Sequence, residues 1–256
     1  MKEERKIPLA TVILAAGQGK RMKRKDIPKV LNTVLGKPMV LYVVELAVAV
    51  GSEKIVVVVG NQAEKVVQAL QDFPVEFAWQ RERLGTGHAV LQAESNLRDF
   101  DGNVLILYGD VPLLTRKTIS ALLKTHETSG ADLTLLITDL ENPTGYGRII
   151  RNEKGEILEV IEEKDATPEQ RAIKESNPGI YVFKKQPLFD YLPKLSNNNA
   201  QGEYYLTDLI GMFARAGLKV VGFKSSNNWE ILGVNTPEHL RQVEELRRLH
   251  PEEYAD

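Results

Sequence analysis

The sequence predicts an α/β fold, in which a doubly wound, mostly parallel sheet is joined to a small mixed α+β subdomain. In the first half of the chain, short apolar runs rich in Val and Ile alternate with helix-like stretches. This alternation is typical of parallel strands that are buried on both faces. In the second half the alternation stops, and a hairpin signal stands among shorter strand-like runs.

The first half supplies four strands and four helices in strict alternation. Strands are expected at residues 9–15, 54–59, 75–79 and 104–108, and helices at 38–50, 63–70, 87–97 and 116–125. Several of these segments end at Gly, begin with Pro, or follow an Asn or Thr that can cap a helix. This order brings the carboxyl ends of the strands to one edge, where α/β sheets bind ligands.

The second half mixes strands and helices. Strands are expected at residues 131–140, 148–151, 157–161, 180–183 and 219–223, and helices at 204–216 and 237–249. Residues 152–155 (NEKG) form a hairpin turn between two of these strands. In the last helix Leu240, Val243, Leu246 and Leu249 recur every three residues, which predicts one apolar face.

Composition excludes several classes of function. The chain has 33 Lys and Arg against 35 Asp and Glu, and a net charge of −2 disfavours binding to a nucleic-acid backbone. The absence of Cys excludes disulfides and thiolate chemistry, and the 4 scattered His do not suggest a zinc site. Neither a membrane-spanning run nor a signal peptide is recognisable, so a cytoplasmic protein is expected.

A glycine loop follows the first strand at residues 14–22 (LAAGQGKRM). It is not a dinucleotide fingerprint, because Met22 stands where a third Gly is needed. It is not a P-loop, because Arg21 follows Gly19 and Lys20 where Ser or Thr is needed. A cluster of cations suits a triphosphate, although a solvated basic loop is the alternative. These cations are Lys20, Arg21, Lys23, Arg24, Lys25 and Lys29.

Asp110 directly follows the apolar run at residues 104–108. A carboxylate at the carboxyl end of a parallel strand can hold Mg²⁺, which prefers oxygen ligands and bridges substrate phosphates. A helix-capping role is less suitable, because Thr115 already stands at the start of the next helix. Asn235 follows another short apolar run, where it could equally cap the helix that begins near Pro237.

Besides the glycine loop, the sequence contains a series of further short motifs: PKVL at 28–31, GKP at 36–38, Gln80, LGTGHA at 84–89, YGDVP at 108–112, GYGR at 145–148, IEEKDA at 161–166, NPGIY at 177–181, NAQGEYY at 199–205 and GVN at 233–235. Taken together, these motifs resemble the signature of the sugar nucleotidyltransferases. The similarity is greatest to the uridylyltransferase part of the bacterial bifunctional N-acetylglucosamine-1-phosphate uridylyltransferases.

The resemblance implies a Rossmann-like nucleotide-diphospho-sugar transferase fold in a single domain spanning 1–256. Residues 7–130 and 219–236 would bind the nucleotide, 131–218 would bind the sugar, and 237–249 would form a C-terminal helix. It implies Mg²⁺-dependent uridylyl transfer from UTP to N-acetylglucosamine 1-phosphate, which yields UDP-N-acetylglucosamine and pyrophosphate. No nucleic acid or membrane partner is expected, and the oligomeric state stays open.

The resemblance also assigns roles to residues. The catalytic residues would be Arg21, Lys29 and Asp110. Mg²⁺ would be held by Asp110 and Asn235. The nucleotide-binding set would be Leu14, Ala15, Ala16, Gly17, Lys29, Gln80, Gly85, Thr86, Tyr108, Gly109 and Asp110. The sugar-binding set would be Gly147, Glu162, Asn177 and Asn235, with Glu203 as a further candidate. The residues alone do not separate Glu162 from Glu163, and His88 is expected to be structural.

The sequence departs from the family pattern in two motifs and in extent. Lys20 replaces a small residue, and Thr236 and Pro237 follow Asn235 where the family has Asn and Arg. The hexapeptide repeats of the acetyltransferase half are absent, so that activity is expected to be missing. Two alternatives stay open. One is another substrate pair, such as UTP or dTTP with glucose 1-phosphate. The other is a nucleotide-binding regulatory module without catalysis.

Overall fold

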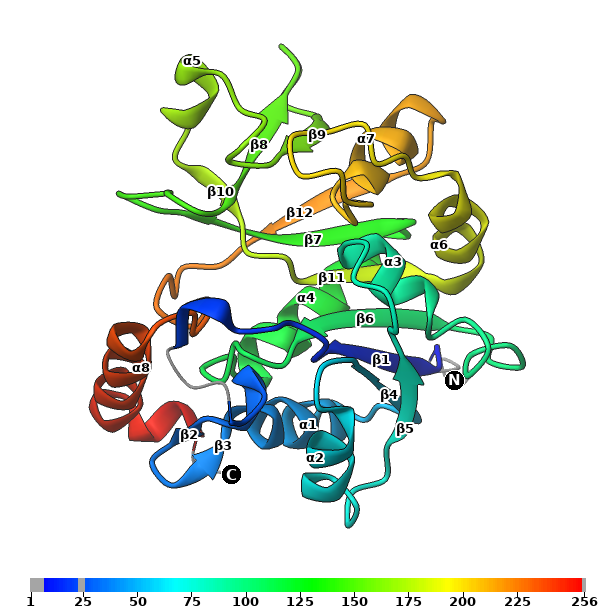
Figure 1. The fold of residues 1–256 in the computed structure, drawn as a ribbon. Coiled ribbons are helices and arrows are strands. Elements are labelled where there is room, and N and C mark those ends of the chain that lie inside the picture. The colour runs from blue at the N-terminus through cyan, green and yellow to red at the C-terminus, as the bar shows by residue number, and fades with distance from the viewer. Residues whose placement is uncertain (1–6, 23–25, 255–256) are drawn as a thin grey trace, which may run out of the picture.

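The computed structural model describes residues 7–22 and 26–254. Within these residues, ten strands form one sheet in the order β5-β4-β1-β6-β11-β7-β10-β8-β9, and β12 also pairs with β7 (Figure 1). The strands of this sheet are β1 Leu9–Leu14, β4 Lys54–Val59, β5 Glu76–Trp79, β6 Asn103–Tyr108, β7 Leu133–Asp139, β8 Gly147–Arg151, β9 Ile157–Ile161, β10 Glu175–Asn177, β11 Tyr181–Lys184 and β12 Val220–Lys224. A separate two-stranded sheet pairs β2 (Thr33–Val34) with β3 (Lys37–Pro38).

Helices cover the sheet on both faces. Their bounds are α1 Met39–Ala49, α2 Ala63–Ala69, α3 Thr86–Leu91, α4 Arg116–Ser129, α5 Pro168–Arg171, α6 Lys185–Tyr191, α7 Asp208–Arg215 and α8 Pro237–Leu249. Figure 1 shows α1 and α2 below β1 and β4, whereas α5, β8 and β9 lie at the top of the molecule.

Strand β1 shows why the sheet is doubly wound. It runs parallel to β4 on one side and to β6 on the other. Val12 and Leu14 pack into a core with residues of α3, α6 and α7, while Ile13 packs into a second core with residues of α1, α2 and α4. Successive side chains of a strand point to opposite faces, so an all-apolar strand needs a helical layer on each side. The predicted α/β class with a mostly parallel central sheet is confirmed.

The second half differs from the prediction in several elements. Strand β11 lies inside the sheet and runs antiparallel to both β6 and β7. Strand β10 and helix α6 were not predicted, because three polar residues and a seven-residue segment carry little periodicity. One element of the first half also differs, because the helix expected at 87–97 ends at Leu91, and turns follow it. Strands β7 and β11 belong to the range predicted to bind the sugar, yet they continue the central sheet. The sheet therefore does not divide where the predicted nucleotide and sugar parts divide, and that division stays a prediction about binding.

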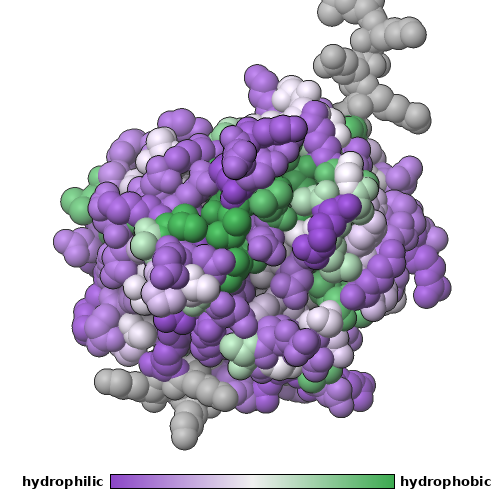
Figure 2. All heavy atoms as spheres, turned by 90° about the horizontal axis from the view of Figure 1, so that it is seen from above, coloured by the Kyte–Doolittle hydropathy of each residue, from purple (hydrophilic) through white to green (hydrophobic). Residues whose placement is uncertain are grey.

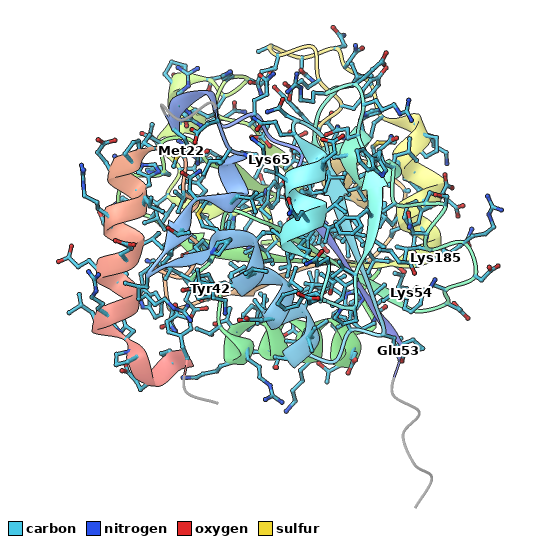
Figure 3. The ribbon with its side chains drawn as sticks, turned by 60° about the horizontal axis from the view of Figure 1, so that its bottom comes forward. Met22, Tyr42, Glu53, Lys54, Lys65 and Lys185 are labelled. Atoms are coloured by element: carbon cyan, nitrogen blue, oxygen red, sulfur yellow. The ribbon has the colours of Figure 1, made fainter. Side chains whose placement is uncertain are left out.

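A small third core holds α8 against the rest of the molecule. It contains Met22, Val34, Met39, Leu113, Val234 and Val243. The guanidinium of Arg247 lies 4.2 Å from the ring centre of Tyr42 and 3.8 Å from that of Tyr254. The Tyr254 hydroxyl donates to the Leu113 carbonyl at 2.7 Å. Figure 3 shows α8 along one edge of the molecule, with the labelled Met22 and Tyr42 on the segments beside it.

Seen from above, the surface is mostly hydrophilic, with a band of hydrophobic residues across its middle (Figure 2). None of the helices in the described part of the chain is long and apolar enough to cross a membrane.

A buried carboxylate fixes the segment that leads to Asn235. Glu230 is fully buried, and its Oε2 accepts from the Thr115 backbone N–H at 3.2 Å and the Thr115 hydroxyl at 3.1 Å. Its Oε1 accepts from the Thr118 hydroxyl at 3.0 Å and from the Asn227 amide at 2.7 Å. Thr115 caps α4, so the carboxylate sits at the positive end of that helix. Four donors thus replace the water that Glu230 loses on burial.

We predict that Glu230→Gln lowers the free energy of unfolding by about 2–4 kcal/mol, because the new amide N–H₂ would face hydrogen-bond donors in a buried site. Urea denaturation of the purified variant measures this change. The matched control is Glu245→Gln, on the exposed side of α8, which should change stability by less than about 0.5 kcal/mol. Equal stabilities for the two variants would contradict the role given to Glu230.

Candidate active site

A single continuous cleft lies at the carboxyl ends of β1 and β6. Its two parts have volumes of about 400 and 670 Å³ and share several lining residues, so they form one space. Volumes of this order are usual for small-molecule sites. The shared lining residues are Arg21, Lys29, Thr86, Tyr108, Asp110, Glu203 and Asn235.

Three segments meet at the junction of the two parts. The Lys29 ammonium donates to the Asp110 carboxylate and, at 3.1 Å, to Oδ1 of Asn235. The Lys29 and Asp110 side chains are only 13% and 12% exposed. The Val234 backbone N–H donates to the Asp110 carbonyl at 2.9 Å, which fixes Asn235 beside the end of β6.

The glycine loop allows Lys29 to approach this junction. Gly19 has φ of +60°, and a Cβ on it would lie 2.6 Å from the Lys29 Cβ, so a side chain would be excluded there. Lys29 itself begins a 3₁₀ turn, and its carbonyl accepts from the Asn32 side chain at 2.7 Å. The side chain of Lys20 and the whole of Lys23, Arg24 and Lys25 lie outside the described residues.

Most residues of the predicted nucleotide-binding set line the larger part of the cleft. These are Leu14, Ala16, Gly17, Lys29, Gln80, Gly85, Thr86, Tyr108 and Asp110. Two members lie beneath the surface of the cleft instead. Ala15 packs in the core beside α1, and the Gly109 N–H donates to the Leu14 carbonyl at 3.0 Å. Both shape the loops that carry the lining residues.

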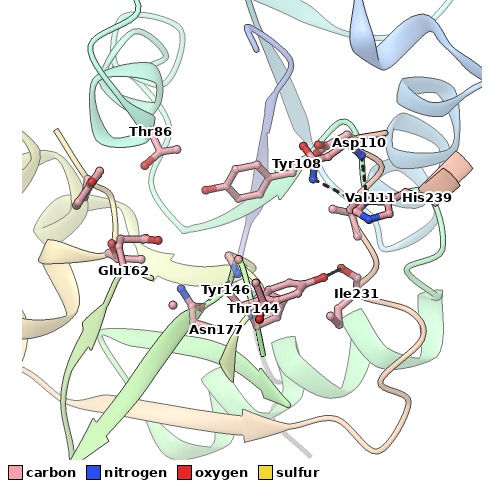
Figure 4. Close-up of a pocket in the computed structure, with 18 of the residues that line it drawn as sticks. Thr86, Tyr108, Asp110, Val111, Thr144, Tyr146, Glu162, Asn177, Ile231 and His239 are labelled. Carbon is pink, nitrogen blue, oxygen red and sulfur yellow. Dashed lines mark hydrogen bonds between the residues drawn. The ribbon is translucent and has the colours of Figure 1, made fainter. Parts of the chain in front are cut away.

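The predicted sugar-binding set lines the smaller part of the cleft. Gly147, Glu162, Asn177, Glu203 and Asn235 all lie there. A Cβ on Gly147 would lie 2.6 Å from Cγ1 of Val160, so any larger residue at this position would displace the Val160 side chain. Figure 4 shows Glu162 and Asn177 on one side of the pocket and Asp110 on the other, with the Tyr108 hydroxyl directed toward Thr86 and Glu162.

Burial raises the pKa of several groups in the cleft, and two of them, Glu162 and Tyr108, belong to the predicted site. Burial raises the pKa of Glu162, the hydrogen bond from the Thr207 hydroxyl at 2.9 Å partly offsets this shift, and the neighbouring carboxylates Asp208, Asp165 and Glu203 add to it. Burial also raises the pKa of Tyr108, and the negative charges of Glu162 and Asp110 add to this effect. Tyr108 therefore stays a neutral hydroxyl at physiological pH and can donate or accept a hydrogen bond.

Several side chains that support the cleft were not found from the sequence. Thr207 orients Glu162, and the Tyr181 hydroxyl accepts from the Asn177 amide at 2.6 Å. The third is Arg148, whose buried guanidinium donates to Glu163 at 2.6 Å and to the Tyr146 carbonyl. Glu163 thus pairs with Arg148, whereas Glu162 lines the cleft. Because Arg148 is part of the GYGR motif at 145–148, its position in a site motif could be recognised from the sequence, but its burial could not.

The junction contains oxygen atoms that could serve as ligands of a hard metal ion. Asp110 offers a carboxylate and Asn235 an amide oxygen, and both already contact one cation, the Lys29 ammonium. Two oxygen donors around a position that accepts positive charge fit Mg²⁺, which takes few protein ligands and completes its shell with water and phosphate oxygens. Within the described residues there is no cluster of three or more His, Asp or Glu for a metal held by protein alone.

Comparison with known proteins assigns the chain to a family. Residues 10–244 match the nucleotidyl transferase family. The bifunctional protein GlmU of Thermus thermophilus is 53% identical over 95% of this chain and 53% of its own length. GlmU of Pelotomaculum thermopropionicum is 48% identical, and that of Marinobacter nauticus 47%. The chain spans about half the length of these relatives.

A solved structure supports the fold independently of sequence. The crystal structure of a UDP-glucose pyrophosphorylase complexed with UDP-glucose superposes with a TM-score of 0.77 at 17% identity. The match covers 95% of this chain and 99% of that one. At such low identity the likeness concerns the fold alone. With its family match over most of the sequence, the chain belongs to the nucleotidyl transferase family and is a transferase of the sugar nucleotidyltransferase type.

Proposed function

We propose that the protein transfers a uridylyl group from UTP to N-acetylglucosamine 1-phosphate, with Mg²⁺, and releases pyrophosphate. The observation that carries this proposal is the meeting of Lys29, Asp110 and Asn235 where the two parts of the cleft join. A reaction between a triphosphate and a sugar phosphate needs a cationic point between a nucleotide pocket and a sugar pocket. The similarity to GlmU proteins supports the choice of substrates.

The chemistry needs no general base from the protein. A phosphate monoester has a second pKa near ~6, so the attacking oxygen of the sugar phosphate is already ionised at neutral pH. It attacks the α-phosphorus in line, and the bond to pyrophosphate breaks on the opposite side. Catalysis then depends on holding two anions together in the correct geometry and on stabilising the charge that develops.

The residues that line the cleft have distinct roles in the proposed reaction. Lys29 and Arg21 neutralise phosphate oxygens, since both line the two parts of the cleft. Asp110 and Asn235 would hold Mg²⁺, which when bound supplies positive charge to the phosphate oxygens. Glu162 accepts from sugar hydroxyls, and Asn177 can donate to or accept from the sugar.

The departure at Thr236 and Pro237 has a local explanation. The Thr236 hydroxyl accepts from the His239 N–H at 3.2 Å, and Pro237 is the first residue of α8. Both residue types are favoured at these positions of a helix. With Thr236 as its N-cap, α8 begins at Pro237, and Asn235 remains at the junction. The choice of sugar rests on Glu162, Asn177 and Gly147 rather than on these two residues.

Pyrophosphate release with a panel of substrates tests the proposed function. The panel pairs UTP, dTTP, CTP and ATP with the 1-phosphates of N-acetylglucosamine and glucose. We expect UTP with N-acetylglucosamine 1-phosphate to give the highest kcat/KM, and only when Mg²⁺ is present. A preference for glucose 1-phosphate would correct the substrate. Binding of UTP without release from any pair would favour a regulatory module.

For Asp110→Asn we expect a loss of at least about 10³-fold in kcat with little change in Tm, because one metal-binding charge is removed while the side chain keeps its size. The measurement is pyrophosphate release across a range of Mg²⁺ concentrations. Asp101→Asn, at an exposed position, is the matched control and should retain activity. Near-normal Mg²⁺-dependent turnover in Asp110→Asn would show that the metal is held elsewhere.

Lys29→Ala removes the ammonium from the junction, and we expect a loss of about 10²-fold or more in kcat. Steady-state kinetics with both substrates varied should show whether the loss lies in kcat rather than in KM. The control is Lys117→Ala, because the Lys117 side chain is 77% exposed. If the kinetics of Lys29→Ala matched those of the control, the phosphates would be neutralised by other residues.

A further inference from the structure

Arg83 and Gln18 both line the larger part of the cleft, and their side chains contact each other. Gln18 lies in the glycine loop, between Gly17 and Gly19, whereas Arg83 lies in the segment between β5 and α3. A guanidinium can only donate, so the Gln18 amide must turn its oxygen toward it. In that orientation the oxygen lies 2.5 and 2.6 Å from the two terminal nitrogens of Arg83. The guanidinium is thus held beside the glycine loop.

The backbone on both sides of this contact is anchored. The carbonyl of Leu84, which follows Arg83, accepts from the Tyr204 N–H at 2.7 Å. A Cβ on Gly85 would lie 2.5 Å from the Tyr204 carbonyl, so this segment packs directly on a neighbouring backbone. On the other side, the close approach at Gly19 holds the glycine loop. The Arg83 guanidinium therefore extends from a fixed backbone to a fixed loop.

The Arg83 guanidinium has no anionic partner. Within the described part of the chain no carboxylate pairs with it, and the neutral Gln18 amide is its polar contact there. Arg148, by contrast, pairs with Glu163. A phosphate can accept two N–H groups of one guanidinium, and such a charge-assisted pair is stronger than a bond to a neutral oxygen. An arriving phosphate can therefore replace the Gln18 amide.

The place of this charge suits the outer two phosphates of a nucleoside triphosphate. An in-line displacement puts the leaving pyrophosphate opposite the attacking oxygen. Since the sugar phosphate would attack from the smaller part of the cleft, pyrophosphate would leave on the side of the larger part. Arg21 and Lys29 line both parts, whereas Arg83 lines only the larger one. A positioned guanidinium there would stabilise the charge that develops on pyrophosphate.

We propose that Arg83 is a further phosphate-binding residue, which holds the β- and γ-phosphates of UTP and the pyrophosphate that they become. This inference rests on the proposed function. Gln18 keeps the guanidinium beside the glycine loop until the phosphates replace the amide. When the bond between the α-phosphorus and the bridging oxygen breaks, its electron pair stays on pyrophosphate. Arg83 donates hydrogen bonds to the pyrophosphate oxygens and keeps its protons.

Calorimetric titration with UTP and with UMP, each with Mg²⁺ present, tests the inference. UMP carries the nucleoside and the α-phosphate but lacks the two phosphates assigned to Arg83. In Arg83→Gln we expect the dissociation constant of UTP to rise roughly tenfold, about the effect of one charge-assisted hydrogen bond. The dissociation constant of UMP should stay within about threefold of its native value, because the contact that is lost is not made by UMP.

The matched control is Arg81→Gln. Arg81 is exposed like Arg83 and stands in the same segment, but it is not among the residues that line the cleft. Its removal takes away the same charge, and solvent and salt screen an exposed charge that touches no phosphate. Both dissociation constants should therefore stay within about threefold of the native values.

Kinetics of the reverse reaction give a second readout. Arg83→Gln should raise the KM for pyrophosphate and leave the KM for UDP-N-acetylglucosamine unchanged, because the nucleotide sugar does not contain the phosphates assigned to Arg83. Arg83→Lys keeps the charge but not the planar pair of donors. Its KM for pyrophosphate should lie between those of the native protein and Arg83→Gln.

Two results would overturn the inference. One is an equal rise in the dissociation constants of UTP and UMP in Arg83→Gln, which would place the guanidinium on the nucleoside or on the α-phosphate. The other is a dissociation constant of UTP in Arg83→Gln that matches the one in Arg81→Gln. Because the first readout is binding, a failure of the proposed function stays distinguishable. That failure would be UTP binding that depends on Arg83 without pyrophosphate release from any substrate pair.

Discussion

The ammonium of Lys29, held between Asp110 and Asn235, is the contact around which the site is organised. These residues come from a turn after the first strand, from the end of β6, and from the segment before α8. Each segment is anchored separately, by the close approach at Gly19, by β6 in the sheet, and by the buried Glu230. This separate anchoring holds the backbone of all three residues in place, so Asp110 and Asn235 would keep their positions if a metal ion replaced the ammonium between them.

The two parts of the cleft are built differently. The side proposed for the nucleotide lies on four parallel strands whose carboxyl ends face one edge, so its loops start from a rigid base. The side proposed for the sugar lies on the antiparallel strands β10, β8 and β9, which are held by Arg148 and its bond to Glu163. Because the two sides are built on different strands, loops of the second can vary without disturbing the first.

The parallel half of the fold was predicted well from the sequence. A short run of β-branched residues such as 54–59 (KIVVVV) is typical of a strand that is buried on both faces. The sequence did not reveal β10, whose residues Glu175–Asn177 are held by pairing with β7 and β8 rather than by their own propensity. The same division applies to the site. A ligand-binding role for Asp110 could be predicted, because it directly follows a strand. The role of Glu230 could not be predicted, because its four hydrogen-bond donors come together only in the folded chain.

The metal site can be located in crystals grown with manganese and UDP-N-acetylglucosamine, because the anomalous scattering of manganese identifies its position independently of the ligand. We expect one peak at about 2.1 Å from the Asp110 carboxylate and from Oδ1 of Asn235, with uracil beside Gln80 and the Lys29 ammonium on a phosphate oxygen. A metal held by other side chains, or a uracil bound away from Gln80, would contradict it.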